Sequence, residues 1–178
     1  CLCNRKGKCC AATEAAKHLK IPLKIINKGE DYLKIVRNPK HGYGSAMNPC
    51  IDCRIFILKK AKEFAKRIRA KFIFTGEVLG QRPMSQHKEA LAIIDKESGL
   101  EGFVLRPLSA KFLPPTKAEK EGWIDRELLL SIKGRSRKKQ IELASSYRIS
   151  GYSCPSGGCL LTDPGFARRL RDLFEHCP

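Results

Sequence analysis

The sequence predicts an α/β protein built around a parallel sheet, followed by a basic helical C-terminal segment. Short apolar runs that suit buried strands alternate with stretches in which apolar residues recur every three or four positions, as on one face of a helix. Strand and helix in alternation are typical of a parallel sheet covered by helices. The last third differs in character, because its predicted helices are basic.

The elements follow from spacing and from helix breakers. In chain order we expect helices over 11–20, 31–37 and 51–70 and from Ser85 to about 97, with strands over 22–26, 71–75 and 102–108. Pro22 must end the first helix, and Gly76 ends the apolar run over 71–75. The helix over 51–70 has the most regular spacing, with Lys and Arg on the face opposite its apolar residues.

The rest of the chain predicts helices over 123–131, 137–147 and 163–176, with a glycine-rich loop over 151–159. We therefore expect two parts, a partial α/β domain over 1–110 and a basic helical segment over 111–178.

The charge of the chain favours a nucleic-acid partner. Its 35 Lys and Arg exceed its 18 Asp and Glu by 17, and a phosphate backbone would screen that surplus. The densest cluster is a candidate RNA-binding segment made of Lys133, Arg135, Arg137, Lys138 and Lys139. The alternative is a lysine-rich surface that serves only solubility. No run is apolar enough for a membrane span or a signal segment, so we expect a cytoplasmic protein with no membrane partner.

The nine cysteines favour metal or redox chemistry over a secreted disulfide scaffold, because their number is odd and no signal segment precedes them. They occur as Cys1, Cys3, Cys9 and Cys10, then Cys50 and Cys53, then Cys154 and Cys159, with Cys177 alone. The first four could close around a zinc ion, although a reduced loop facing solvent explains them as well. Cys50 and Cys53 form a C-x-x-C at the start of a predicted helix, where thiolates are stabilised. The alternatives for this pair are packed small residues or a thioredoxin-like dithiol.

A second motif, T-G-E-V-L-G-Q, follows the predicted strand over 71–75. Ligands bind outside the carboxyl ends of strands in open parallel sheets. The glycines of the motif would let the backbone approach a nucleotide, and its polar side chains offer hydrogen bonds; a tight turn alone would also need glycine. The candidate nucleotide-binding residues are Thr75, Gly76, Glu77, Gly80 and Gln81.

These motifs, in this order, resemble the adenine-nucleotide α-hydrolase branch of the ATP pyrophosphatases, specifically its tRNA-thiolating members. T-G-E-V-L-G-Q, then Ser85-Gln86 and V-L-R-P-L over 104–108, are similar to stretches of the 4-thiouridine synthase family. N-P-C-x-x-C over 48–53, with a distant G-G-C ending at Cys159, resembles the active-site cysteines of tRNA 2-thiouridylases. The resemblance implies a three-layer, Rossmann-like fold. It also implies that ATP, with Mg²⁺, adenylates a uridine carbonyl and that sulfur from a desulfurase or from sulfide displaces AMP.

The S-G-G-x-D-S phosphate loop of that family does not occur in the chain. We therefore expect the first βα unit to precede Cys1 or to come from another polypeptide, and this chain alone to be inactive.

The resemblance leaves two mechanisms open. In one, Cys50, Cys53 and Cys159 bind a [4Fe-4S] cluster with an open iron position that could carry hydrosulfide; Cys154 would close the site as a fourth ligand. In the other, Cys159 carries a persulfide that Cys53 resolves, so that these two are the catalytic residues. Outside this family, a metal-stabilised RNA-binding module or a thiouridine desulfidase remain alternatives.

Overall fold

A computed structural model of the chain describes residues 10–149 and 159–176. The described residues form two compact units, and each is considered by itself. The larger unit consists of Tyr32–Gly42 and Pro49–Ser136. The smaller unit takes in the chain up to Asp31, then Tyr43–Asn48 and the residues from Arg137 onward. The division does not test the expected domains over 1–110 and 111–178, which stay a prediction.

The larger unit combines a short parallel sheet with two long helices. Its elements are α3 (Cys50–Arg67), β1 (Ile73–Phe74), α4 (Lys88–Ser98), β2 (Val104–Leu105), the 3₁₀ turn η1 (Ala110–Phe112), α5 (Lys117–Lys120) and the 3₁₀ turn η2 (Arg126–Leu128). The strands run parallel, with Ile73 opposite Val104 and Phe74 opposite Leu105. Since α4 lies between them in sequence, they form the strand–helix–strand unit that the alternation predicted.

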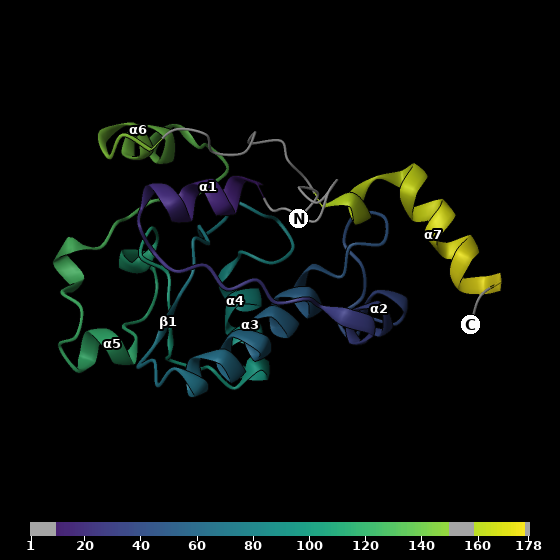
Figure 1. Ribbon diagram of the computed structural model, residues 1–178, viewed down its shortest axis with the longest axis horizontal. Helices are drawn as coiled ribbons and strands as arrows, with labels where there is room; N and C mark the ends of the chain where they lie inside the picture. The colour runs from purple at the N-terminus through teal and green to yellow at the C-terminus, as the bar shows by residue number, and fades with distance from the viewer. Residues whose placement is uncertain (1–9, 150–158, 177–178) are drawn as a thin grey trace. The chain divides into compact units, whose positions relative to one another are not determined.

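The core of this unit lies between the sheet and the helices α3 and α4 (Figure 1). Ile55 and Leu58 of α3 pack there with Ile94 of α4, and Leu100 and Val104 complete the cluster. The helix α4 ends at Gly99, which adopts a left-handed φ of 66° that a β-carbon would strain. This packing fixes the start of α3 relative to the ends of both strands.

The smaller unit is helical in its described part. It holds α1 (Cys10–His18), the 3₁₀ turn η3 (Leu160–Thr162), α6 (Lys138–Ser146) and α7 (Pro164–His176), while α2 (Gly29–Arg37) runs across the boundary into the larger unit. Met47 is buried, and its N–H donates to the carbonyl of Leu161 at 3.0 Å. This bond joins the short segment before Asn48 to the C-terminal part of the chain.

Three expectations about elements were wrong. Residues 22–26 form no strand, because no described segment pairs with them; Ile25 is 63% exposed. The helix expected over 123–131 shrinks to η2, because the N–H groups of Leu130 and Ile132 donate to the carbonyls at 107 and 108 instead. The helix expected from Ser85 begins at Lys88, capped by the His87 side chain.

The chain therefore has an α/β fold that is mostly helical, with a small parallel sheet among the described residues. None of the helices in 10–149 and 159–176 is long and apolar enough to span a bilayer.

Candidate active site

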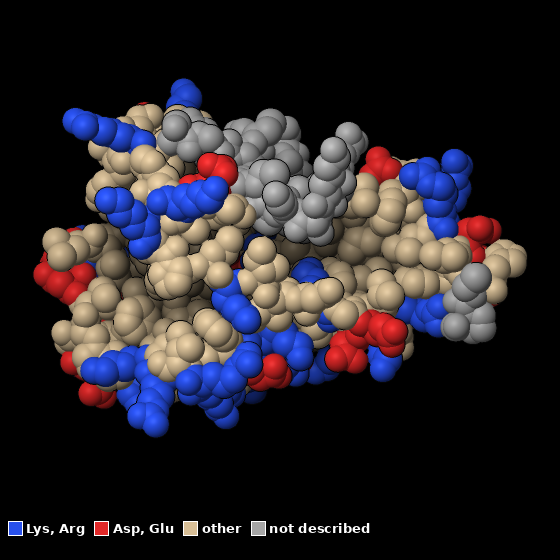
Figure 2. All heavy atoms as spheres, in the orientation of Figure 1, with Lys and Arg blue, Asp and Glu red and all other residues tan. Residues whose placement is uncertain are grey.

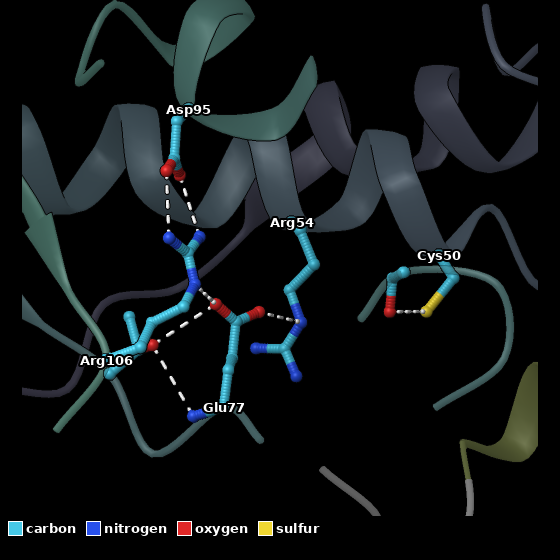
Figure 3. Close-up of polar contacts among 7 residues, drawn as sticks. Cys50, Arg54, Glu77, Asp95 and Arg106 are labelled. Carbon is cyan, nitrogen blue, oxygen red and sulfur yellow. Dashed lines mark hydrogen bonds and ion pairs between the residues drawn. The ribbon is translucent and has the colours of Figure 1, made fainter. Parts of the chain in front are cut away.

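The candidate site lies where the two parallel strands end. Glu77 follows β1 and Arg106 follows β2 directly, so both leave the sheet at the same edge. The Arg106 guanidinium donates two hydrogen bonds to Asp95 of α4, at 2.7 and 2.8 Å, and its Nε donates to Glu77 Oε2 at 3.0 Å (Figure 3). This network ties both strand ends to α4.

The network is almost fully enclosed, since Glu77 and Arg106 are each 4% exposed. Burial disfavours the charged guanidinium, but the hydrogen bonds and charges of Asp95 and Glu77 outweigh it and raise the pKa of Arg106. Arg106 therefore stays ionised and holds its carboxylates in place.

A second arginine reaches Glu77 from the side of the cysteines. Arg54 of α3 places its Nε 3.4 Å from Glu77 Oε1, and Figure 3 shows both arginines turned toward this carboxylate. Thr75 Oγ1 also donates to Glu77 Oε2 at 3.1 Å. Glu77 and Thr75 thus contact each other after β1, and the Glu77 carboxylate also faces two arginines. A direct contact of Glu77 with a nucleotide stays a prediction.

The two glycines of the T-G-E-V-L-G-Q motif have different surroundings. Gly80 has a φ of 76°, and a β-carbon on it would lie 3.4 Å from the backbone N of Gly134. The N–H of Gly134 donates to the carbonyl of Leu79 at 2.7 Å, so this glycine serves a close approach of two backbone segments. Nothing lies within 4 Å of a β-carbon on Gly76. Gly76 is the open position of the motif, and Gln81, which follows Gly80 in the sequence, is half-buried.

The C-x-x-C pair stands at the first turn of α3, as predicted. Cys50 opens the helix, and its Sγ donates to Ser85 Oγ at 3.0 Å, the contact drawn at the right of Figure 3. Cys53 Sγ accepts a hydrogen bond from the Tyr32 hydroxyl at 3.2 Å. Both thiols are half-buried and neither is in a disulfide. Each sulfur therefore has a hydroxyl partner from a segment distant in sequence.

The third predicted ligand, Cys159, belongs to the smaller unit. It precedes η3, is half-buried, and its carbonyl accepts a hydrogen bond from Thr162 Oγ1 at 2.6 Å. In the part of the chain that the structure describes, no group of three His, Cys, Asp or Glu side chains is gathered for a metal. Convergence of Cys50, Cys53 and Cys159 stays a prediction. Cys154 and the proposed zinc ligands Cys1, Cys3 and Cys9 lie outside the described residues, as does the side chain of Cys10.

The predicted RNA-binding segment crosses the boundary between the units. Lys133 and Arg135 belong to the larger unit, whereas Arg137, Lys138 and Lys139 belong to the smaller one. Lys133 is exposed, with its Nζ 4.7 Å from the centre of the Phe112 ring. Four of the five side chains are exposed and Arg137 is half-buried, and RNA binding by this segment stays a prediction.

Sequence reasoning missed three residues around the cysteines. Arg54 and Tyr32 carry no spacing signal, because their partners lie far away in the chain. His41 was also missed: its Nδ1 lies 3.0 Å from Asp52 Oδ1 and its Nε2 lies 3.0 Å from Glu97 Oε1. Asp52 lies between the two cysteines in sequence and is 8% exposed. A buried carboxylate needs a polar partner, so its position among the apolar residues of α3 was the signal from which a partner such as His41 could have been predicted.

One comparison places the chain, with the cysteine pair and the motif at the strand end, in a family of tRNA-thiolating proteins. A family model described as Thiamine biosynthesis protein (ThiI) matches residues 9–111, more than half of the chain. The chain belongs to this family, which confirms the resemblance inferred from the motifs. Searches of curated proteins and of solved structures gave no match.

Proposed function

We propose that the chain takes part in the thiolation of uridine in tRNA, in the cytoplasm. The observation that carries this proposal is that the family match spans both the C-x-x-C pair and the T-G-E-V-L-G-Q motif. In the proposed reaction ATP transfers AMP to a uridine carbonyl oxygen and releases pyrophosphate. Sulfur from a desulfurase or from sulfide then attacks the ring carbon, and AMP leaves with the oxygen. The full three-layer fold of such an enzyme is part of the proposal.

Residues at the strand ends and at the start of α3 both suit this chemistry. Gly76 leaves its backbone open to an incoming nucleotide, whereas the Glu77–Arg106–Asp95 network holds the loop around it. Helix α3 presents Cys50 and Cys53 together in its first turn, each in contact with a hydroxyl group.

The donor set fits an iron–sulfur cluster, because two half-buried thiols outside any disulfide stand one helical turn apart. Cys50, Cys53 and Cys159 would hold a [4Fe-4S] cluster, which when bound supplies an iron with an open coordination position. Tyr32 and Ser85 would orient the first two ligands through their hydroxyl groups. In the alternative mechanism, sulfur is carried as a persulfide on Cys159, and Cys53 attacks that persulfide, releasing the terminal sulfur and forming a disulfide between the two.

The test replaces each cysteine in the gene of the host cell and measures thiolated nucleosides in its tRNA by mass spectrometry. We expect Cys53→Ser and Cys159→Ser to abolish one thiolated uridine, because both mechanisms need these thiols. The two mechanisms separate at Cys50→Ser, which abolishes the product only if three thiols hold a cluster.

A matched control is Ser146→Ala, an exposed hydroxyl on α6, which should leave the product unchanged. A thiolated uridine that accumulates in Cys53→Ser cells would instead identify a desulfidase. Unchanged nucleosides in every variant would leave only an RNA-binding module and would contradict the proposal.

A further inference from the structure

A second candidate site lies at the opposite edge of the small sheet. Phe72 and Phe103 directly precede β1 and β2, so they stand at the amino ends of the parallel strands, away from Glu77 and Arg106. Between them is a groove of about 230 Å³, walled by the last turns of α3 and by the turn after α4. This volume is below the roughly 300 Å³ at which pockets for drug-sized ligands begin, so the groove suits one small flat group.

The groove is apolar at its base and positive at its rim. Ala65, Phe72, Leu100 and Phe103 are among its apolar lining residues. Its charged lining residues are Lys62, Lys66 and Lys71, and the described residues that line it include no carboxylate. Figure 2 shows Lys and Arg side chains gathered along the lower edge of the view, over the last turns of α3.

Two aromatic rings beside the groove are already in contact with cations. Lys71 Nζ lies 4.9 Å from the centre of the Trp123 ring, and Lys117 Nζ lies 5.2 Å from that of Phe103. Trp123 and Phe103 are 36% and 37% exposed, so part of each ring faces solvent. Aromatic faces beside ammonium groups are the combination on which an unpaired base stacks while its phosphates are held. An acidic peptide would use the lysines but would leave the rings and the apolar base without a partner.

From this we infer that the groove binds one unpaired nucleotide of RNA, with the base against Phe72 and Phe103 and the flanking phosphates on Lys66 and Lys71. The inference rests on the proposed function, in that the RNA would be the tRNA substrate. It adds a second contact, because Lys66 is 16 residues after Cys50 in the same helix, which is about 24 Å at 1.5 Å per residue. At about 3.4 Å per stacked nucleotide, that distance corresponds to roughly seven nucleotides of one strand. The nucleotide in the groove is therefore not the uridine that reacts at the cysteines.

The experiment measures tRNA binding to the whole chain by fluorescence anisotropy at several salt concentrations. For Lys66→Ala with Lys71→Ala, we expect weaker binding and a slope of log K against log salt that is smaller by about 1.4, for two single-strand phosphate contacts. For Ala70→Leu, which narrows the groove, and Phe103→Leu, which removes a ring, we expect about five- to tenfold weaker binding with an unchanged slope. Lys62 is kept, because its Nζ donates to the carbonyl of Gly99 at 2.7 Å.

The matched control is Lys24→Ala with Lys88→Ala, two exposed lysines that do not line the groove. Equal weakening by both double variants would show that positive charge anywhere suffices and would overturn the inference. Photocrosslinking with 5-iodouridine in the tRNA should give adducts at Phe72, Phe103 or Trp123, and adducts only elsewhere would also overturn it.

Competition separates the alternatives that remain. Polyuridylate should displace the tRNA better than polyglutamate of equal charge, and the reverse order would assign the groove to an acidic protein segment. If the groove variants bind tRNA as the unchanged chain does, the inference fails and the proposed function stands. If the unchanged chain binds no tRNA, the proposed function itself fails.

Discussion

At the scale of single residues, Arg106 decides how the candidate site is held. It contacts carboxylates from two other segments, Glu77 after β1 and Asp95 in α4, and it is itself anchored by the end of β2. Glu77 in turn lies next to Arg54, four residues after Cys50 in α3. One connected set of charges therefore joins the loop of the predicted nucleotide site to the helix of the cysteines.

Replacing Arg106 should be costly for this reason. We expect Arg106→Gln to lower the free energy of unfolding by about 3–5 kcal/mol, because it leaves Asp95 without its cation and leaves the enclosed Glu77 carboxylate with Arg54 alone. Arg106→Lys should cost less, since it keeps the charge but loses the paired geometry. Urea unfolding followed by circular dichroism measures both.

The control for Arg106 is Arg135→Ala, an exposed arginine of the same unit, which should change stability by no more than about 0.5 kcal/mol. Equal effects of Arg106→Gln and Arg135→Ala would mean that the network does not stabilise the fold.

The sequence indicated the cysteines and the motif of the candidate site better than the residues that hold them in place. The C-x-x-C pair and the T-G-E-V-L-G-Q motif are local patterns, so their place at a helix start and a strand end could be predicted. Arg106 stood within a motif that was noted, but nothing in the sequence pairs it with Asp95 or Glu77. Hydroxyl partners such as Tyr32 come from other segments, and only folding brings them to the thiols.

At the scale of elements, the helices α3, α4 and α7 and the strands β1 and β2 lie where they were predicted, whereas the strand over 22–26 and the helix over 123–131 do not form. The apolar spacing of α3, α4 and α7 is intrinsic to each helix, whose backbone bonds are closed within the segment. A strand needs a neighbour, and residues 22–26 lack one among the described residues despite their apolar character. The helix prediction over 123–131 was wrong for the opposite reason, because N–H groups of this segment donate to carbonyls outside it.

The short helix α5 predicts a pH effect on stability. Its capping box pairs Thr116 with Glu119, and Arg126 forms an ion pair with the same carboxylate. Burial raises the pKa of Glu119, but the Thr116 and Arg126 contacts outweigh it, so the pKa lies below its ordinary value. A lowered folded-state pKa gives stability that is present above the unfolded pKa of about 4.3 and is lost as pH falls through the folded value.

We therefore expect Glu119→Gln to reduce the free energy of unfolding by about 1 kcal/mol at pH 7 and by less at pH 3.5. Denaturant unfolding at the two pH values measures the difference. A loss that stays constant or grows toward low pH would contradict the assigned role of the ionised carboxylate.

At the scale of the whole molecule, the charge of +17 should dominate binding to tRNA. Replacing Arg135, Arg137, Lys138 and Lys139 together by Ala should weaken binding and reduce the slope of log K against log salt by about 2.8, if each makes one single-strand phosphate contact. Titration of labelled tRNA at 50 to 300 mM salt measures it. Binding that does not depend on salt in the unchanged chain would contradict an electrostatic interface.

The shortness of the sheet also has a consequence for how the larger unit opens. Only a few backbone bonds join β1 to β2, among them those from the N–H groups of Ile73 and Thr75 to the carbonyls at 103 and 105. A sheet with so few hydrogen bonds has little cooperativity of its own. The Arg106 side chain supplies a further connection between the strands, because it bonds Glu77, which follows β1. The amide hydrogens of both strands should therefore exchange with solvent through one shared opening event, whose rate is set by the release of a guanidinium rather than by strand separation.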